Sequence, residues 1–308
     1  MSTSTNPWFV SDEVASALRD GLGVVALETT IIVHGLPRPV NLEVARECED
    51  AVRAAGAVPA TIGVLSGRAT IGLSYDEIVR LADPERAAVK LSSRDLGVAS
   101  ALGVDGATTV AGTITLAALA GISIMATGGL GGVHRDANAS FDESADLSAL
   151  ARTPVMVVAS GVKSILDIAA TLERLETLGI PVIGYRTSRF PGFYRTDSGY
   201  PIEWRVEDPA TAAAAFDSHV RLGGSGIVLA NPIDPARQLD GAVHEMALGA
   251  ALQRVSAEHI SGKAVTPAML STFSQRAGDS NLQVNRDLVV ANASLAGEVA
   301  AAVANTKQ

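Results

Sequence analysis

Lys163 is the side chain whose surroundings in the sequence best suit covalent chemistry. The apolar run Pro154–Ser160 lies between breakers, which is typical of a central parallel strand, and the pattern Ser164–Leu178 predicts a helix soon after Gly161. Lys163 is therefore expected between a strand's carboxyl end and a helix's first turn, where partial burial and the helix dipole both favour the uncharged amine. An uncharged lysine attacks carbonyl carbon and forms a Schiff base. The alternative is a surface lysine whose stem covers apolar neighbours.

Glu28 is the second candidate, because it interrupts the β-branched run Val24–Val33, which predicts a strand. A carboxylate inside a buried strand must be paired, metal-bound or protonated, since an isolated buried charge is very costly. Successive side chains of a strand point to opposite faces, so the alternative is that Glu28 faces solvent. His34 follows at the predicted strand end, where it supports a turn or touches a ligand.

Two further segments offer groups that bind anions. Lys90 lies in the predicted strand Ala87–Leu91, and Arg94 follows it. Either side chain suits an anionic substrate, although ordinary surface ion pairing is the default explanation for both when they are taken alone. The segment Thr127–His134 holds four glycines, which let backbone amides approach a ligand closely. It matches neither the dinucleotide-binding nor the Walker glycine pattern.

Three carboxylates, Asp142, Glu143 and Asp146, fall within five residues before a predicted helix. Acidic residues are common in a helix's first turn, so capping explains one or two of them. Oxygen ligands also suit a hard ion such as manganese or magnesium that keeps most of its water shell. No His/Cys spacing typical of zinc is present.

Strands alternate with helices along most of the chain. This order predicts a three-layer α/β/α fold with a mainly parallel sheet and a helical C-terminal section at 235–258, 267–277 and 281–303. Asn41 is expected to cap a helix that ends near Ala55, and Gly106–Leu119 is expected to be another helix. Sites in such sheets form at strand carboxyl ends. The predicted active-site rim therefore combines Lys90, the glycine segment, Lys163 and Asn231, with Glu28 lying inside its strand.

Composition excludes several functional classes. The chain has 308 residues, 47% of them hydrophobic, and a net charge of −9, which argues against nucleic acid or an anionic membrane as the main partner. We expect no membrane-spanning run and no signal peptide. The single cysteine, Cys48, suits packing and a cytoplasmic protein.

Several segments together resemble the pseudouridine-5'-phosphate glycosidase family, which includes indigoidine synthase A-like proteins. They run in order from about residue 12 to 303 and include ALETTIIVHGLPRPVNLEVA, KLSSRDL, GATTVAGT, ATGGLGGVHR, FDESADL, ARTPVMVVASGVKSILDIAATLERLETLGIPVIGYRT, ANPI and NRDLVVANA. The resemblance implies one catalytic domain over residues 1–308, a homotrimer and one manganese ion per subunit. It implies reversible cleavage of pseudouridine 5'-phosphate to uracil and ribose 5-phosphate.

The resemblance also implies roles for individual residues. Lys163 corresponds to the family's covalent lysine, Glu28 to its proton donor and Asp142 to its metal ligand. The substrate-contacting positions correspond to Lys90, the backbone near Val110, and Ser144, Ala145 and Asp146. The rival readings are a Schiff-base sugar-phosphate aldolase and a non-enzymatic nucleotide or sugar-phosphate sensor.

Some questions stay open from the sequence. They are the physiological direction, the metal used in the cell, the help that Glu143 gives the ion, and substrate contact by His34, His134 or Asn285. The segment 185–204 holds six of the chain's twelve aromatic residues and suits a lid or a subunit contact.

Overall fold

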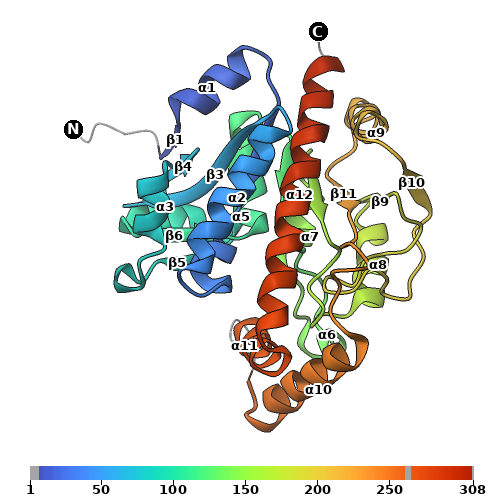
Figure 1. Ribbon diagram of the computed structural model, residues 1–308. Coiled ribbons are helices and arrows are strands. Elements are labelled where there is room, and N and C mark those ends of the chain that lie inside the picture. The colour runs from blue at the N-terminus through green and yellow to red at the C-terminus, as the bar shows by residue number, and fades with distance from the viewer. Residues whose placement is uncertain (1–6, 261–264, 307–308) are drawn as a thin grey trace.

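The computed structural model describes residues 7–260 and 265–306 and contains one mixed, mostly parallel sheet with helices on both faces (Figure 1). The strands are β1 (Trp8–Val10), β2 (Val24–Leu27), β3 (Val58–Leu65), β4 (Arg68–Ile71), β5 (Val89–Leu91), β6 (Gly106–Thr108), β7 (Ile124–Ala126), β8 (Met156–Ala159), β9 (Val182–Tyr185), β10 (Trp204–Val206) and β11 (Ile227–Ala230). The helices are α1 (Asp12–Arg19), α2 (Val40–Ala54), α3 (Tyr75–Leu81), α4 (Leu96–Leu102), α5 (Val110–Ala120), α6 (Ala137–Ser140), α7 (Ala145–Leu150), α8 (Ile168–Thr177), α9 (Pro209–Arg221), α10 (Gly241–Ala257), α11 (Val265–Ala277) and α12 (Asp279–Thr306). The predicted three-layer architecture is confirmed.

The sheet has the order β1-β4-β3-β2-β7-β8-β11-β9-β10, with β6 joined to β3 and β5 joined to β6. The pairings from β3 through β2, β7, β8, β11 and β9 to β10 are parallel. The outer half of β3 pairs antiparallel with β4 and β6. The strands β2, β7, β8 and β11 are buried throughout, as expected for parallel strands covered on both faces.

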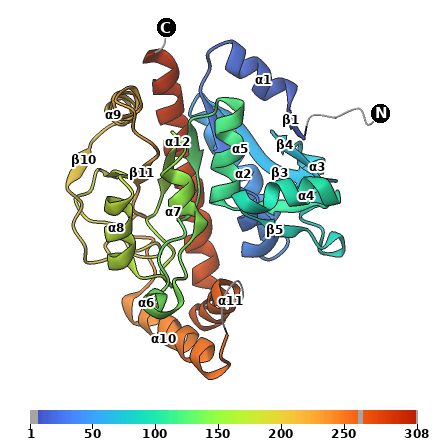
Figure 2. The same cartoon turned by 180° about the vertical axis from the view of Figure 1, so that it is seen from behind.

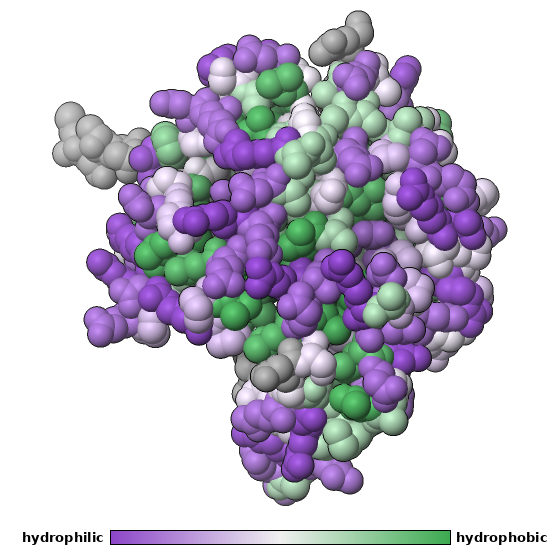
Figure 3. Space-filling model, viewed as in Figure 1, coloured by the Kyte–Doolittle hydropathy of each residue, from purple (hydrophilic) through white to green (hydrophobic). Residues whose placement is uncertain are grey.

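The last helix, α12, crosses one face of the sheet beside α2, and α5 and α7 lie on the other face (Figures 1 and 2). α10 and α11 pack on each other at the end from which α12 starts. The segment Ser280–Thr306 is long and apolar enough to cross a membrane by length and composition alone. Most of it is buried against α2, α9 and the central strands, so core packing accounts for its apolar residues. The face seen in Figure 3 is largely hydrophilic, with apolar residues scattered over it.

Several predicted boundaries are wrong for local reasons. The strand Val24–Val33 ends at Leu27, and a π-helical turn, Ile31–Gly35, follows. Asn41 does not cap α2: it is buried in that helix, and its Nδ2 donates to the Ile32 carbonyl at 2.8 Å.

Three helices begin later than their patterns predict. Gly106–Thr108 forms β6, and α5 starts after the cap Thr109. α8 starts at Ile168, after its cap Asp167, and α10 starts at Gly241, after its cap Asp240. In each case a hydroxyl or carboxylate accepts from a first-turn amide and fixes the start.

Candidate active site

Glu28 lies directly after the last residue of β2, at the strand's carboxyl end, and not inside a strand as predicted. The hydroxyl of its neighbour Thr29 donates to the Ile62 carbonyl of β3 at 2.8 Å. Glu28 is 8% exposed, and its Oε1 accepts a hydrogen bond from the Thr127 hydroxyl. Burial raises the pKa of Glu28, while the Lys163 ammonium and the Thr127 hydroxyl act in the opposite direction. The carboxyl group is therefore suited to hold and release a proton.

Lys163 follows β8, the strand next but one to β2 in the sheet. The segment between β8 and α8 has no helix: Val162 bridges Leu130, and the Lys163 amide donates to the Leu130 carbonyl at 3.0 Å. α8 starts five residues beyond Lys163, so the expected effect of a helix amino terminus at the lysine is wrong. Lys163 is half-buried, and its charge acts on both Glu28 and His134. The fold thus brings together the predicted nucleophile and the predicted acid.

Gly161 shapes the turn that presents Lys163. Its φ is +81°, and a Cβ there would lie 2.2 Å from the Pro191 carbonyl oxygen, so a side chain would push this segment out of place.

Asp146 joins two elements of the site. Its Oδ1 accepts from the Ala111 amide at 2.9 Å and its Oδ2 from the Gly131 amide at 2.8 Å. Asp146 is only 5% exposed. Its two hydrogen bonds fasten the first turn of α5, which begins at Val110, to the glycine segment. Ser144 caps α7, and Ala145 opens it. The predicted substrate-contacting run is therefore a structural joint within the site, and its contact with substrate stays a prediction.

Lys90 reaches the site from β5, in the mixed half of the sheet. Its side chain is exposed, and its charge acts on Glu28, His34 and His134. Burial and the Lys90 charge both lower the pKa of His34. Burial lowers the pKa of His134, Lys90 and Lys163 act in the same direction, and the Asp142 carboxylate opposes them. His34 therefore lies close to Lys90, and His134 lies close to both lysines.

Asp142 is the predicted metal ligand, and its carboxylate is 34% exposed. Its Oδ2 lies 3.9 Å from His134 Nε2. Glu143 points elsewhere, because its Oε2 accepts from Arg174 Nε at 2.8 Å. In the described part of the chain, no three His, Cys, Asp or Glu side chains gather as they would for a metal ion. One accessible carboxylate fits an ion that keeps most of its waters, and does not fit a cage built only from protein ligands.

The aromatic segment 185–204 packs on the site within its own chain. The Phe193 amide donates to the Ser160 carbonyl at 3.0 Å, and a Cβ on Gly129 would lie 2.5 Å from the Phe193 ring. Tyr194 is fully buried and stacks on Phe273 of α11, with ring centroids 5.1 Å apart. The segment therefore covers the glycine loop and the end of β8.

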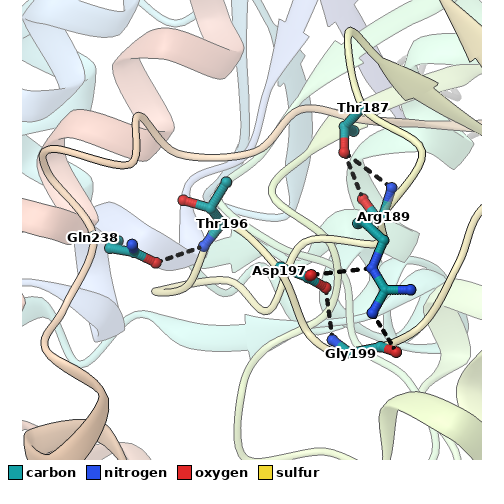
Figure 4. Close-up of polar contacts among 6 residues, drawn as sticks. All are labelled: Thr187, Arg189, Thr196, Asp197, Gly199 and Gln238. Atoms are coloured by element: carbon teal, nitrogen blue, oxygen red, sulfur yellow. Dashed lines mark hydrogen bonds and ion pairs between the residues drawn. The ribbon is translucent and has the colours of Figure 1, made fainter.

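The outer part of this segment is cross-linked by polar contacts (Figure 4). Arg189 donates to the Asp197 carboxylate at 3.0 Å and to the Gly199 carbonyl at 2.7 Å. The Thr196 amide donates to Gln238 at 3.2 Å, which ties the segment to the chain between β11 and α10.

Sequence reasoning missed Asn292 as part of this site, and it included Thr127 only as the first residue of the glycine segment. Thr127 touches Glu28, and Asn292 lies in the middle of α12 with its side chain completely buried. The spacing of Asn281, Asn285 and Asn292 places all three on one face of α12, which was an available signal. Asn285 is named among the open substrate contacts above, and its buried Oδ1 has no hydrogen-bond partner in the structure.

The fold and the site define an α/β enzyme with a lysine and a carboxylic acid at the exits of central parallel strands. The family model for indigoidine synthase A-like proteins matches residues 13–302, and the chain belongs to this family. It is 55% identical to the pseudouridine-5'-phosphate glycosidase of Salinispora tropica over 294 residues, which is 95% of this chain and 90% of the relative.

Two solved structures have the same fold. The prealnumycin C-glycosynthase AlnA, solved in complex with ribulose 5-phosphate, is 40% identical, has a TM-score of 0.90, and matches over 97% of this chain and 98% of its own. An indigoidine synthase A-like protein from Thermotoga maritima is 32% identical, with a TM-score of 0.88 and 99% of each chain covered.

Proposed function

We infer that this chain is a pseudouridine-5'-phosphate glycosidase, which reversibly cleaves the C–C glycosidic bond to give uracil and ribose 5-phosphate. The observation that carries this conclusion is the placement of Lys163 near the buried acid Glu28 at strand exits, in a chain with glycosidase relatives at about half identity. The names of these relatives and of the C-glycosynthase describe enzymes that act on the same kind of bond, a C-glycosidic bond.

The residues account for the special difficulty of this bond. Uracil leaves through a carbon atom, so the usual glycosidase scheme with two carboxylates and water is inadequate. Lys163 Nζ attacks C1' as the ring oxygen leaves with a proton from Glu28, so the ribose ring opens and C1' carries both the lysine nitrogen and uracil. The lysine nitrogen then gives a proton to Glu28, and its lone pair forms the C1'=N imine as the bond between C1' and the uracil carbon breaks. Glu28 delivers its proton to that uracil carbon. Hydrolysis of the imine then frees ribose 5-phosphate and restores the amine.

The substrate phosphate needs positive groups in a protein of net negative charge. The Lys90 ammonium and the backbone at Val110, in the first turn of α5, are the proposed phosphate contacts. The amides of Ala111 and Gly112 in that turn already bond to Asp146 and to the Thr109 hydroxyl. Ser144, Ala145 and Asp146 are the other proposed substrate contacts, and Asp146 also holds the turn and the glycine segment in place.

A manganese ion is part of the proposal. Asp142 would hold it through a carboxylate oxygen, with water as the other ligands. When bound, the ion supplies positive charge that helps to hold the anionic substrate. His134 lies beside Asp142, and the charges of Lys90 and Lys163 act on it.

The assembly and the compartment also belong to the proposal. We expect a homotrimer in the cytoplasm, and native mass spectrometry measures the mass of the assembly. The exposed apolar side chains of Val98 and Leu102 on α4 and Leu119 on α5 are available for a subunit contact.

The rival readings fare differently. A Schiff-base aldolase built as a closed eight-stranded barrel does not fit, because the sheet in the described residues is open and ends at β1 and β10. A sensor on the same fold would bind the sugar phosphate without forming a bond.

Borohydride trapping tests the proposal directly. Ribose 5-phosphate and borohydride should add a reduced adduct to Lys163, which peptide mass spectrometry locates. Lys163→Arg is the matched control and should remain unmodified. In the synthetic direction, pseudouridine 5'-phosphate should form only when uracil is added. The glycosidase mechanism would be contradicted if no adduct forms on Lys163, or if ribose 5-phosphate is consumed in the absence of uracil.

A further inference from the structure

Asn292 uses both ends of its buried amide to join segments that carry the reaction. Its Nδ2 donates to the Thr127 carbonyl at 2.8 Å and to the Ser160 hydroxyl at 3.1 Å. Its Oδ1 accepts from Asn231 Nδ2 at 3.0 Å. Thr127, Ser160 and Asn231 directly follow β7, β8 and β11, so one side chain links the exits of three adjacent strands.

The contact with Thr127 leads directly to the acid. The Thr127 hydroxyl donates to the Glu28 carboxyl group, while the Thr127 amide is held by the Val158 carbonyl at 3.1 Å. With its carbonyl held by Asn292, the main chain of Thr127 is fixed on both sides. The hydroxyl direction therefore depends on a side chain that itself does not touch Glu28.

The contact with Ser160 leads to the nucleophile. Ser160 lies three residues before Lys163, and its amide donates to the Gly128 carbonyl at 2.9 Å. Packing does not explain an asparagine here, since the surrounding positions Leu288, Val289, Ala293 and Ala296 are buried and apolar. A buried amide costs free energy unless its hydrogen bonds are made, and in Asn292 they are made to the site.

We propose that Asn292 is a positioning residue for the reaction: it fixes the Thr127 main chain so that the Thr127 hydroxyl aims the Glu28 carboxyl group, and it fixes the turn that presents Lys163. This inference rests on the proposed glycosidase function. It assigns a role to the middle of the core helix α12, which otherwise contributes packing.

The mechanism predicts a shift in the pH profile. The hydrogen bond from Thr127 lowers the pKa of Glu28. Losing it should therefore move the limb of the kcat–pH profile that reports Glu28 (the Glu28 limb) to higher pH. The charged and titratable groups that act on Glu28 are Lys163, Lys90 and Asp146, and Cys48 of α2 lines the small cavity beside it. None of these groups is altered by the variants below.

The test compares Asn292→Ala, Thr127→Val and the double variant with the unaltered chain, using uracil release from pseudouridine 5'-phosphate. Asn292→Ala should lower kcat about tenfold or more, with a smaller change in KM, and move the Glu28 limb upward. Thr127→Val should move the same limb. In the double variant Asn292→Ala should add little to that shift, because both changes break one connection.

The matched control is Asn281→Ala, which removes a buried asparagine of the same helix whose Nδ2 bonds to Ser274 instead. It should lower the melting temperature without moving the limb. The inference is overturned if Asn292→Ala leaves the profile in place, or if its shift adds fully to that of Thr127→Val. If Asn292→Ala does not fold, Asn292→Ser is compared in the same way. Failure of the unaltered chain to release uracil would instead reject the proposed function.

Discussion

The two halves of the sheet contribute to the site in different ways. From β2 through β7 and β8 to β11 every pairing is parallel, so strand exits lie at one edge and bring Glu28, the glycine segment and Lys163 together. On the other side, β3 turns to pair antiparallel with β4 and β6, and Lys90 comes from the exposed strand β5. In the proposed mechanism, the parallel half performs the chemistry and the mixed half supplies charge for binding.

Lys163 in the parallel half should give the largest effect. Lys163→Ala and Lys163→Arg should abolish turnover, because no other group replaces the covalent amine. Uracil release measured by chromatography gives the rate, and circular dichroism checks folding. Turnover at the normal rate in either variant would contradict the proposed mechanism.

Glu28 should give the second largest effect. Glu28→Gln keeps the size of the side chain and should lower kcat about 10²–10⁴-fold, with residual activity, since it removes only proton transfer. Steady-state kinetics and borohydride trapping separate the steps. An unchanged kcat would show that the acid lies elsewhere.

Lys90 tests the binding role of the mixed half. Lys90→Ala should raise KM for pseudouridine 5'-phosphate about tenfold to hundredfold with a smaller change in kcat, because one charged contact to phosphate is lost. Arg86→Ala removes an exposed charge in the turn before β5 and should change neither constant. A fall in kcat alone would place Lys90 in the chemistry and break the comparison.

The metal role of Asp142 can be measured without turnover. Asp142→Asn should weaken Mn²⁺ binding about tenfold or more, as followed by electron paramagnetic resonance of the free ion. Glu143→Gln is the control, because that carboxylate bonds to Arg174. Equal weakening in both variants would indicate two ligands in place of one.

The smallest effect concerns stability. Because burial raises the pKa of Glu28, its contribution is most favourable below the unfolded pKa and is lost as the pH rises through the folded value. Glu28→Gln should therefore raise the melting temperature at neutral pH and have less effect near pH 4. Each pKa unit between the folded and the unfolded value of Glu28 corresponds to about 1.4 kcal/mol in the free energy of unfolding. The exposed Glu203→Gln should show no such pH dependence.

Local signals located much of this site. The breakers around Pro154–Ser160 and the run at Gly128–Gly132 mark where the chain leaves the sheet, and such marks depend only on nearby residues. Starts of helices were less well predicted. At Asp167 and Thr109 several nearby side chains could have formed the cap, and contacts with Val133 and with Leu91 decided which one did.

The amino-acid sequence by itself determined the alternation of strands and helices, the buried central strands and the chemical types at their exits, because these follow from local propensity and hydrophobic pattern. Only the tertiary structure decided that Glu28 ends its strand, that both oxygens of Asp146 are used by backbone amides, and that Asn292 links three strand exits. Those outcomes depend on pairs of atoms far apart in the chain, which no local pattern encodes.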